Sequence, residues 1–180
     1  YFSTIEEYRD PESLNAYHEL LASGVSEREA LIILQLKSRD NARTPMQWDN
    51  SKYQGFSVVE PWLAVNNNQI SAEKELKDPN SIFYTYQRLI AYRKKFPVFT
   101  EGDYRLLDEE HSELFCYERT CNQEKLLVIS NFSRKNVAYQ LPSDYKTAQI
   151  LESNYGRKQV EAAFQLKPYE SLLLYQKMRL

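Results

Sequence analysis

Ser38 to Asp49, which reads SRDNARTPMQWD, holds the greatest concentration of side chains that could do chemistry. Arg39 and Arg43 are four residues apart, and each guanidinium suits carboxylates, phosphates or the vicinal hydroxyls of a sugar. Trp48 could stack on an apolar sugar face or anchor the loop in a core. The nearby acceptors and amides are Asp40, Asn41, Gln47 and Asp49. This mixture indicates either a polar binding site or a local network that holds the backbone in place.

Histidine and cysteine are too sparse to suggest a metal centre. His18 and His111 are far apart, and Cys116 and Cys121 are the only cysteines. Their spacing matches no metal-ligand pattern, so we expect no metal site, no cofactor and two reduced thiols.

The overall charge indicates no macromolecular partner. The 23 basic residues nearly balance the 25 acidic ones, which argues against nucleic acid or an anionic membrane as a partner. No apolar run approaches the roughly 20 residues that cross a bilayer. The first ten residues lack the basic and apolar regions of a signal peptide, so we expect a cytoplasmic protein. The chain begins without methionine, which suggests a piece of a longer protein.

Helix signals dominate the first part of the chain. Asp10 followed by Pro11 is a helix start, and apolar spacing predicts a helix to about Ser23. A capping box that begins at Ser26 predicts a second helix through Leu36.

An irregular loop follows over residues 38–68, then a short helix over 71–76 and a longer one after Pro79 that ends near Phe96. Three large aromatic residues in the loop are expected to bury against a partner surface: Trp48, Phe56 and Trp62.

The last part of the chain shows strand signals instead of helix signals. Seven short apolar runs separated by turn residues predict an antiparallel sandwich or barrel. The runs are 103–108, 113–120, 125–133, 136–141, 148–153, 162–166 and 171–176.

Several segments resemble the C-terminal third of α-glucosidases of glycoside hydrolase family thirteen, the α-amylase family. They are IEEYRDPESLNAY, SRDNARTPMQWD, GFSVVEPWLAVNNN and DPNSIFYTYQRLIAYRK. The most similar members are oligo-1,6-glucosidases, dextran glucosidases and trehalose-6-phosphate hydrolases. The matching segments run in the family's order over nearly the whole chain, which is stronger evidence than one short motif.

The resemblance implies an α+β fragment. Residues 1–95 would be the end of a catalytic (β/α)8 barrel, with helices and a substrate-pocket loop, and residues 96–180 an all-β antiparallel sandwich. A complete barrel needs about 250 residues. The family's catalytic aspartate, glutamate and second aspartate lie on earlier barrel strands, and none of their motifs occurs here. The chain alone is therefore expected to contain no catalytic residue and to be inactive.

By the same resemblance, three residues would line the substrate pocket. Arg39 matches the arginine that binds the non-reducing-end glucose and pairs with an upstream aspartate. Arg43 matches a neighbouring pocket arginine, and Glu12 matches a glutamate that contacts the second sugar. A salt bridge within the barrel scaffold is the structural alternative for each.

The parent enzyme would hydrolyse α-glucosidic bonds of short oligosaccharides or of trehalose 6-phosphate, with retention. The segment 30–49 is slightly more like trehalose-6-phosphate hydrolases. Its partners would be an α-glucoside and the missing barrel portion, and the fragment could self-associate through apolar residues that the barrel would cover, namely Leu14, Ile32, Ile33 and Trp48. The alternative is a free-standing β-sandwich module that binds carbohydrate or protein.

Overall fold

The computed structural model describes residues 2–66 and 69–177, so the last two residues of the predicted loop 38–68 lie outside the described part. The chain divides into two compact units, 1–87 and 88–180. This division falls within one helix, earlier than the predicted domain boundary after Lys95. None of the described helices is long and apolar enough to span a membrane.

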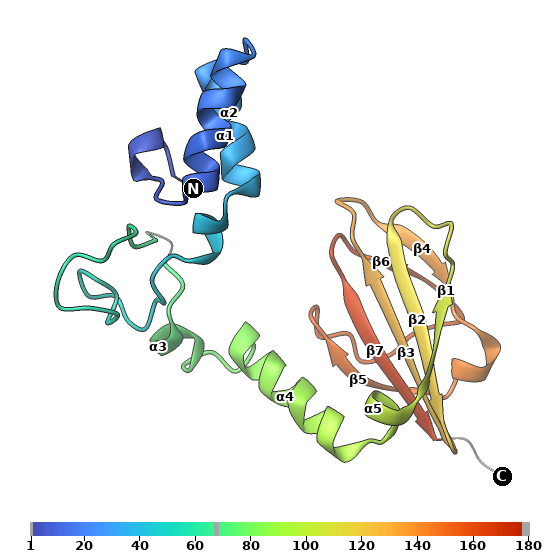
Figure 1. Cartoon of the computed structure of the whole chain (residues 1–180). Helices are drawn as coiled ribbons and strands as arrows, with labels where there is room; N and C mark the ends of the chain where they lie inside the picture. The colour runs from blue at the N-terminus through green and yellow to red at the C-terminus, as the bar shows by residue number, and fades with distance from the viewer. Residues whose placement is uncertain (1, 67–68, 178–180) are drawn as a thin grey trace. The chain divides into compact units, whose positions relative to one another are not determined.

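Short helices and one long loop make up the first unit (Figure 1). Its elements are η1 Ile5–Glu7, α1 Pro11–Ala22, α2 Glu27–Lys37, η2 Arg39–Ala42, α3 Ala72–Glu75 and the start of α4 Ile82–Lys95. The four predicted helices are confirmed. Asp10 caps α1 and the predicted capping box at Ser26 caps α2, while Gly24 separates them with φ of +89°.

A small core holds α1 and α2 together. Its buried residues are Phe2, Tyr8, Tyr17, Ala30, Leu34 and Leu63. The described loop residues 43–66 form turns but no helix or strand. Trp48, Phe56 and Trp62 are 54%, 52% and 71% exposed, so none of these three side chains is buried by the described residues.

All seven predicted strands are present in the second unit. They are β1 Asp103–Leu107, β2 Leu114–Cys121, β3 Glu124–Asn131, β4 Val137–Gln140, β5 Gln149–Ser153, β6 Ala163–Leu166 and β7 Ser171–Lys177. A five-stranded sheet has the order β1-β2-β3-β7-β5, and β4 pairs with β6 in a second sheet. Every pairing is antiparallel, which confirms the predicted sandwich. Its core includes Cys116, Ile129 and Leu174 from the large sheet and Tyr139 and Leu166 from the small one.

The other face of the large sheet is partly covered by the end of α4 and by α5 Val98–Glu101, a short helix that was not predicted. Val98 is fully buried against Leu126 and Leu173, and the rings of Phe96 and Tyr175 are 4.5 Å apart. This contact involves only residues of the second unit.

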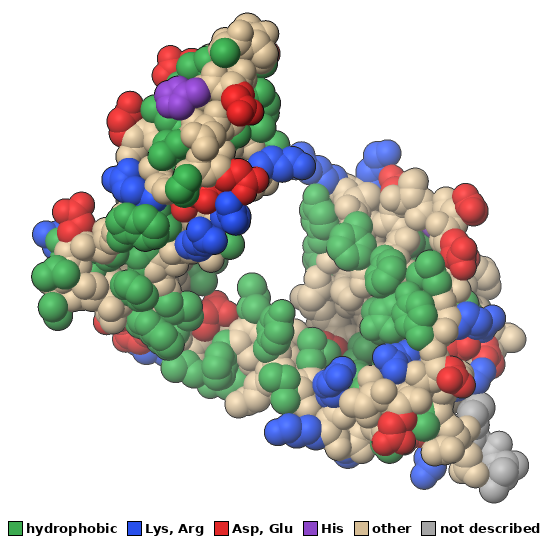
Figure 2. All heavy atoms as spheres, in the orientation of Figure 1, with side chains coloured by type: hydrophobic (Ala, Val, Ile, Leu, Met, Phe, Trp, Pro, Cys, Tyr) green, Lys and Arg blue, Asp and Glu red, His purple; other side chains and the backbone are tan. Residues whose placement is uncertain are grey.

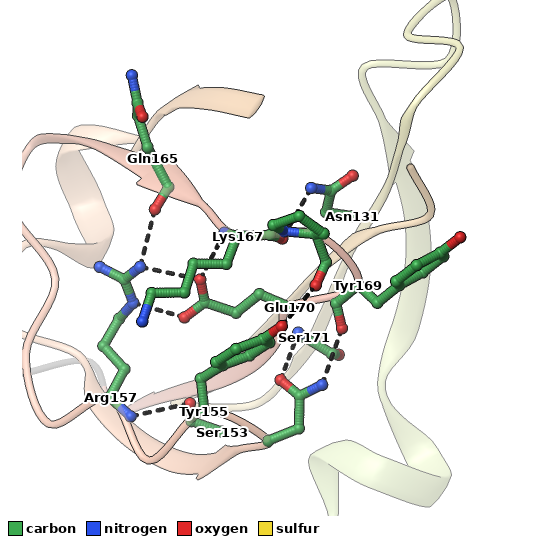
Figure 3. Close-up of polar contacts among 11 residues, drawn as sticks. Asn131, Ser153, Tyr155, Arg157, Gln165, Lys167, Tyr169, Glu170 and Ser171 are labelled. Carbon is green, nitrogen blue, oxygen red and sulfur yellow. Dashed lines mark hydrogen bonds and ion pairs between the residues drawn. The ribbon is translucent and has the colours of Figure 1, made fainter. Parts of the chain in front are cut away.

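A polar cluster closes the β5–β6 and β6–β7 connections (Figure 3). Glu170 is 1% exposed and accepts hydrogen bonds from Arg157 Nε at 2.7 Å, Arg157 Nη2 at 2.9 Å and the Lys167 amide at 2.8 Å. Asn154 bridges the Tyr169 carbonyl and the Ser171 amide. Because the backbone groups of these turns are paired by side chains, the two connections are held in one conformation.

Candidate functional site

The starts of α1 and η2 lie together, joined through their capping residues. Asp10 Oδ2 accepts from the Ser13 amide at 3.3 Å and lies 3.0 Å from the Ser13 hydroxyl. That hydroxyl is 2.8 Å from the hydroxyl of Ser38, which caps η2 by accepting from the Asp40 amide at 3.2 Å. All four residues are buried, so the network fixes the turn that carries Arg39 against the first turn of α1.

Asp40 anchors this junction. Its side chain is fully buried, and Oδ2 accepts from the backbone amides of Arg9 at 2.7 Å and Asp10 at 2.8 Å. Its other oxygen, Oδ1, has no hydrogen-bond partner among the described residues. Asp40 therefore holds backbone in place through Oδ2, as the structural alternative predicts.

Two other polar residues of the central motif also hold backbone. The Asn41 side-chain amide donates to the Gln35 carbonyl at 2.9 Å, near the end of α2. Asp49 Oδ1 accepts from the Ser51 amide at 2.8 Å in the loop that follows.

Arg39 extends from η2 toward the start of α1. Its Nη2 lies 3.3 Å from Asp10 Oδ1 and donates a hydrogen bond to the Glu12 carboxylate. The Arg39 side chain is 55% exposed and that of Glu12 75% exposed, so both keep free surface for a ligand. The structure thus brings together two of the three predicted residues. It adds Asp10, which sequence reasoning identified only as a helix cap.

The pKa of Asp10 reflects competing influences. Burial raises it, but the Ser13 hydrogen bonds and the charges of Arg39 and Arg43 together lower it below its usual value. Asp10 is therefore a carboxylate at neutral pH and accepts hydrogen bonds rather than donating a proton.

Arg43 follows η2 as its C-cap residue, and its side chain is exposed. Within the described part of the chain it makes no hydrogen bond or ion pair with Arg39, Glu12 or Asp10. Its charge nevertheless acts on Asp10, as the lowered pKa shows. Arg43 therefore influences the cluster through its charge but does not contact it.

The Arg39 and Glu12 side chains of the cluster are exposed, whereas Asp10 is buried. A pocket of about 650 Å³ lies near the end of α2 and is lined by residues that include Phe2, Gln35 and Asn41. None of the three predicted site residues lines it. The described residues also contain no group of three or more side chains that could hold a metal ion.

The chemistry of the cluster suits the binding of hydroxyl groups. Retaining glycosidases need two carboxyl groups about 5 Å apart, one of which must be protonated to act as the acid. Asp10 and Glu12 instead share the Arg39 guanidinium, whose charge favours the ionised form of Asp10. An arginine with two carboxylates can hydrogen-bond a sugar, but it lacks a proton donor for bond cleavage.

Two family models and several known proteins match this chain. Residues 14–102 match the family model of the α-amylase catalytic domain, and residues 114–173 match that of the α-amylase SusG C-terminal domain. The oligo-1,6-glucosidase of Halalkalibacterium halodurans is 43% identical over 94% of this chain and 31% of its own length. The trehalose-6-phosphate hydrolase of Bacillus subtilis is 42% identical over 96% of this chain and 32% of its own length.

Solved structures of related enzymes share the fold of this chain. The trehalose-6-phosphate hydrolase of Bacillus licheniformis superposes with a TM-score of 0.90 and 44% identity, over 97% of this chain and 33% of that one. The trehalulose synthase of Pseudomonas mesoacidophila gives 0.87 and 32% identity, over 97% of this chain and 33% of its own. This chain spans about a third of the length of these relatives. It belongs to the α-amylase family, in which it corresponds to the end of the catalytic barrel domain and the antiparallel C-terminal domain that follows.

Proposed function

We propose that the chain is the C-terminal part of a retaining α-glucosidase that cleaves short α-glucosides. The observation that carries this proposal is the ordered match to a catalytic domain and then a C-terminal domain, at 42–43% identity to glycoside hydrolases. The chain contributes part of the substrate-binding rim, and the catalytic carboxylates are supplied by the barrel strands of the remaining two thirds. The predicted division into barrel residues 1–95 and sandwich residues 96–180 is part of this proposal.

Within the complete enzyme, Arg39 contacts the glucosyl unit at the non-reducing end. The exposed part of its guanidinium supports this role, since among the described residues Asp10 and Glu12 contact Nη2 and leave Nη1 and Nε for a ligand. Glu12 would contact the second sugar, and its exposed carboxylate is compatible with that role. Arg43 would add positive charge beside them.

The substrate is either a short α-glucan oligosaccharide or trehalose 6-phosphate. Relatives with both names match this chain at nearly equal identity, 43% and 42%. A cytoplasmic location is a further part of the proposal, supported by two free cysteines, as is usual in a reducing compartment.

A hybrid enzyme tests the proposal. In the Bacillus subtilis relative, the stretch that matches this chain is replaced by residues 1–180, and glucose release is measured with trehalose 6-phosphate and isomaltose. Arg39→Met in the hybrid is expected to lower kcat/KM about 10- to 100-fold, because a hydrogen bond to a charged group contributes about 1.5–3 kcal/mol. Arg28→Met, which removes an exposed arginine of α2, is the matched control and should leave kcat/KM unchanged.

Two results would contradict this role. Equal effects of the Arg28 and Arg39 substitutions would remove Arg39 from the binding rim. Binding of maltose, isomaltose or a glucan by the 180-residue chain without any barrel would favour a free-standing carbohydrate-binding module instead.

A further inference from the structure

The two carboxylates that contact Arg39 differ in how firmly they are held. Both reach the same nitrogen, since Asp10 Oδ1 lies 3.3 Å from Arg39 Nη2 and the Glu12 carboxylate accepts a hydrogen bond from it. The Asp10 side chain is 4% exposed and that of Glu12 is 75% exposed. Basic and acidic side chains lie next to one another on the face of the first unit that Figure 2 shows. One guanidinium nitrogen is therefore shared between a buried carboxylate and a solvated one.

Asp10 is fixed through both its side chain and its backbone. Its Oδ2 accepts from the Ser13 amide at 3.3 Å and lies 3.0 Å from the Ser13 hydroxyl. Its own amide donates to Asp40 Oδ2 at 2.8 Å, and its carbonyl accepts from the Leu14 amide at 3.1 Å. These contacts hold the carboxylate in one orientation, with Oδ1 toward Arg39.

Glu12 is not held in this way. Its side chain extends from the first turn of α1 into solvent, and an exposed ion pair of this kind contributes little because ordering two long side chains costs entropy. Glu12 can therefore leave Arg39 and turn to a ligand, whereas Asp10 cannot.

We propose that Asp10 is a positioning residue of the substrate pocket: its buried carboxylate holds Arg39 Nη2, so that Nη1 and Nε are presented to the substrate, and Glu12 stays free to contact the sugar. An arginine that is 55% exposed would otherwise sample many rotamers. A donor that is already oriented loses less entropy when the substrate binds. The inference rests on the proposed function, because it requires Arg39 to bind substrate.

Helix capping alone is the rival role for Asp10, and one substitution separates the two roles. Asparagine caps a helix about as well as aspartate. In Asp10→Asn the amide oxygen must take the place of Oδ2 to accept from the Ser13 amide. The side-chain NH2 then takes the place of Oδ1 and faces Arg39 Nη2, so two donors meet. The substitution keeps the cap and removes the anchor.

A double-mutant cycle in the hybrid enzyme described above tests the proposal. Asp10→Asn should lower kcat/KM about 10-fold, because a misplaced binding group costs activity, while Tm stays within about 3 °C. In the Arg39→Met background the same substitution should change kcat/KM less than about twofold, since the group to be positioned is already absent. Glu19→Gln, which removes an exposed carboxylate from the same helix, is the matched control and should leave kcat/KM unchanged.

Three results of the cycle would overturn the proposal. Full activity of Asp10→Asn would show that no anchor is needed. An equal loss in the presence and absence of Arg39 would show that Asp10 acts through something else. A loss that comes with a clearly lower Tm in both backgrounds would leave Asp10 as a helix cap only.

Chemical modification of Arg39 gives a second measurement that does not require an active enzyme. Phenylglyoxal attacks the guanidinium nitrogens, and mass spectrometry of peptides reports the rate at each arginine of the hybrid. Asp10→Asn should speed the modification of Arg39 several-fold, because Nη2 is released and its carboxylate partner no longer favours the charged form. Arg28, which is exposed on α2, should react at an unchanged rate.

An unchanged rate at Arg39 would overturn the proposal, as would an equal increase at Arg28, which indicates general loosening of the fold. Failure of the proposed function looks different. If Arg39→Met and Arg28→Met have equal effects on kcat/KM while Asp10→Asn still speeds the modification of Arg39, then the anchor is present and the substrate-binding role of Arg39 is contradicted.

Discussion

Replacing Arg157 with methionine should destabilise the sandwich by about 3–5 kcal/mol, the usual cost of removing one partner of a buried ion pair. Glu170 is 1% exposed and has three donors, two on Arg157 and one on the Lys167 amide. The substitution leaves only the amide donor, at 2.8 Å, for a carboxylate that is 1% exposed. The Gln165 carbonyl also loses its hydrogen bond from Arg157 Nη2, which is 2.8 Å long.

The assay is urea unfolding of the 180-residue chain, followed by far-UV circular dichroism and by hydrogen exchange of β7 peptides. The only two tryptophans, Trp48 and Trp62, lie in the other unit, so their fluorescence should not report the change. Lys158→Met is the matched control, because Lys158 is exposed in the adjacent turn. A free energy of unfolding within about 0.5 kcal/mol of wild type for Arg157→Met would refute the reasoning.

The pH dependence of the free energy of unfolding is a second test of the Arg157–Glu170 pair. Burial raises the pKa of Glu170, but the Arg157 hydrogen bonds and charge lower it overall, while the pKa of Arg157 is raised. A carboxyl group with a lowered folded-state pKa stabilises the fold above its unfolded pKa of about 4.3 and loses this contribution as pH falls toward the folded value. The difference between wild type and Arg157→Met should therefore be full at neutral pH and shrink below about pH 4.

Three further outcomes are expected. Ellman's reagent at about pH 8 should modify Cys121 quickly and Cys116 only after unfolding. Cys116 is fully buried, and burial raises its pKa to about 11. Equal rates of modification of the two cysteines would contradict this burial. In the hybrid enzyme, Asp40→Ala should lower the free energy of unfolding by about 2–5 kcal/mol, since the backbone amides of Arg9 and Asp10 lose their charged acceptor. Asp40→Asn should lower it by less than half of that, and equal losses would refute the anchor role. Limited trypsin digestion of the chain alone should cut residues 1–68 before 96–180, and gel filtration should show self-association; digestion of the sandwich first would contradict the prediction that it folds by itself.

Local signals account for the parts of the fold that were predicted. Caps at Asp10 and Ser26 are short-range interactions, so the sequence indicated α1 and α2 closely. The strands were equally visible as short apolar runs between turns. The helix α5 was missed because four residues after Pro97 are too few to show a 3.6-residue period. The pairing of β4 with β6 depends on contacts between distant segments, which no local pattern specifies.

The site was only partly predictable for the same reason. The family resemblance predicts Arg39 and Glu12 as site residues, and the structure places them in contact. The contact of Asp10 with Arg39 and the burial of Asp40 arise from tertiary packing between segments about thirty residues apart. A charged motif such as Ser38–Asp49 cannot show which of its side chains turn inward until its neighbours in space are known.

The most direct test of the account is glucose release by the rigorously purified 180-residue chain alone, with isomaltose and trehalose 6-phosphate as substrates. The account predicts no release above the uncatalysed rate, because Arg39 occupies the space between the carboxylates of Asp10 and Glu12 and the chain lacks a proton-donating acid beside a nucleophile. Measurable release that disappears on Glu12→Gln or Asp10→Asn would contradict it.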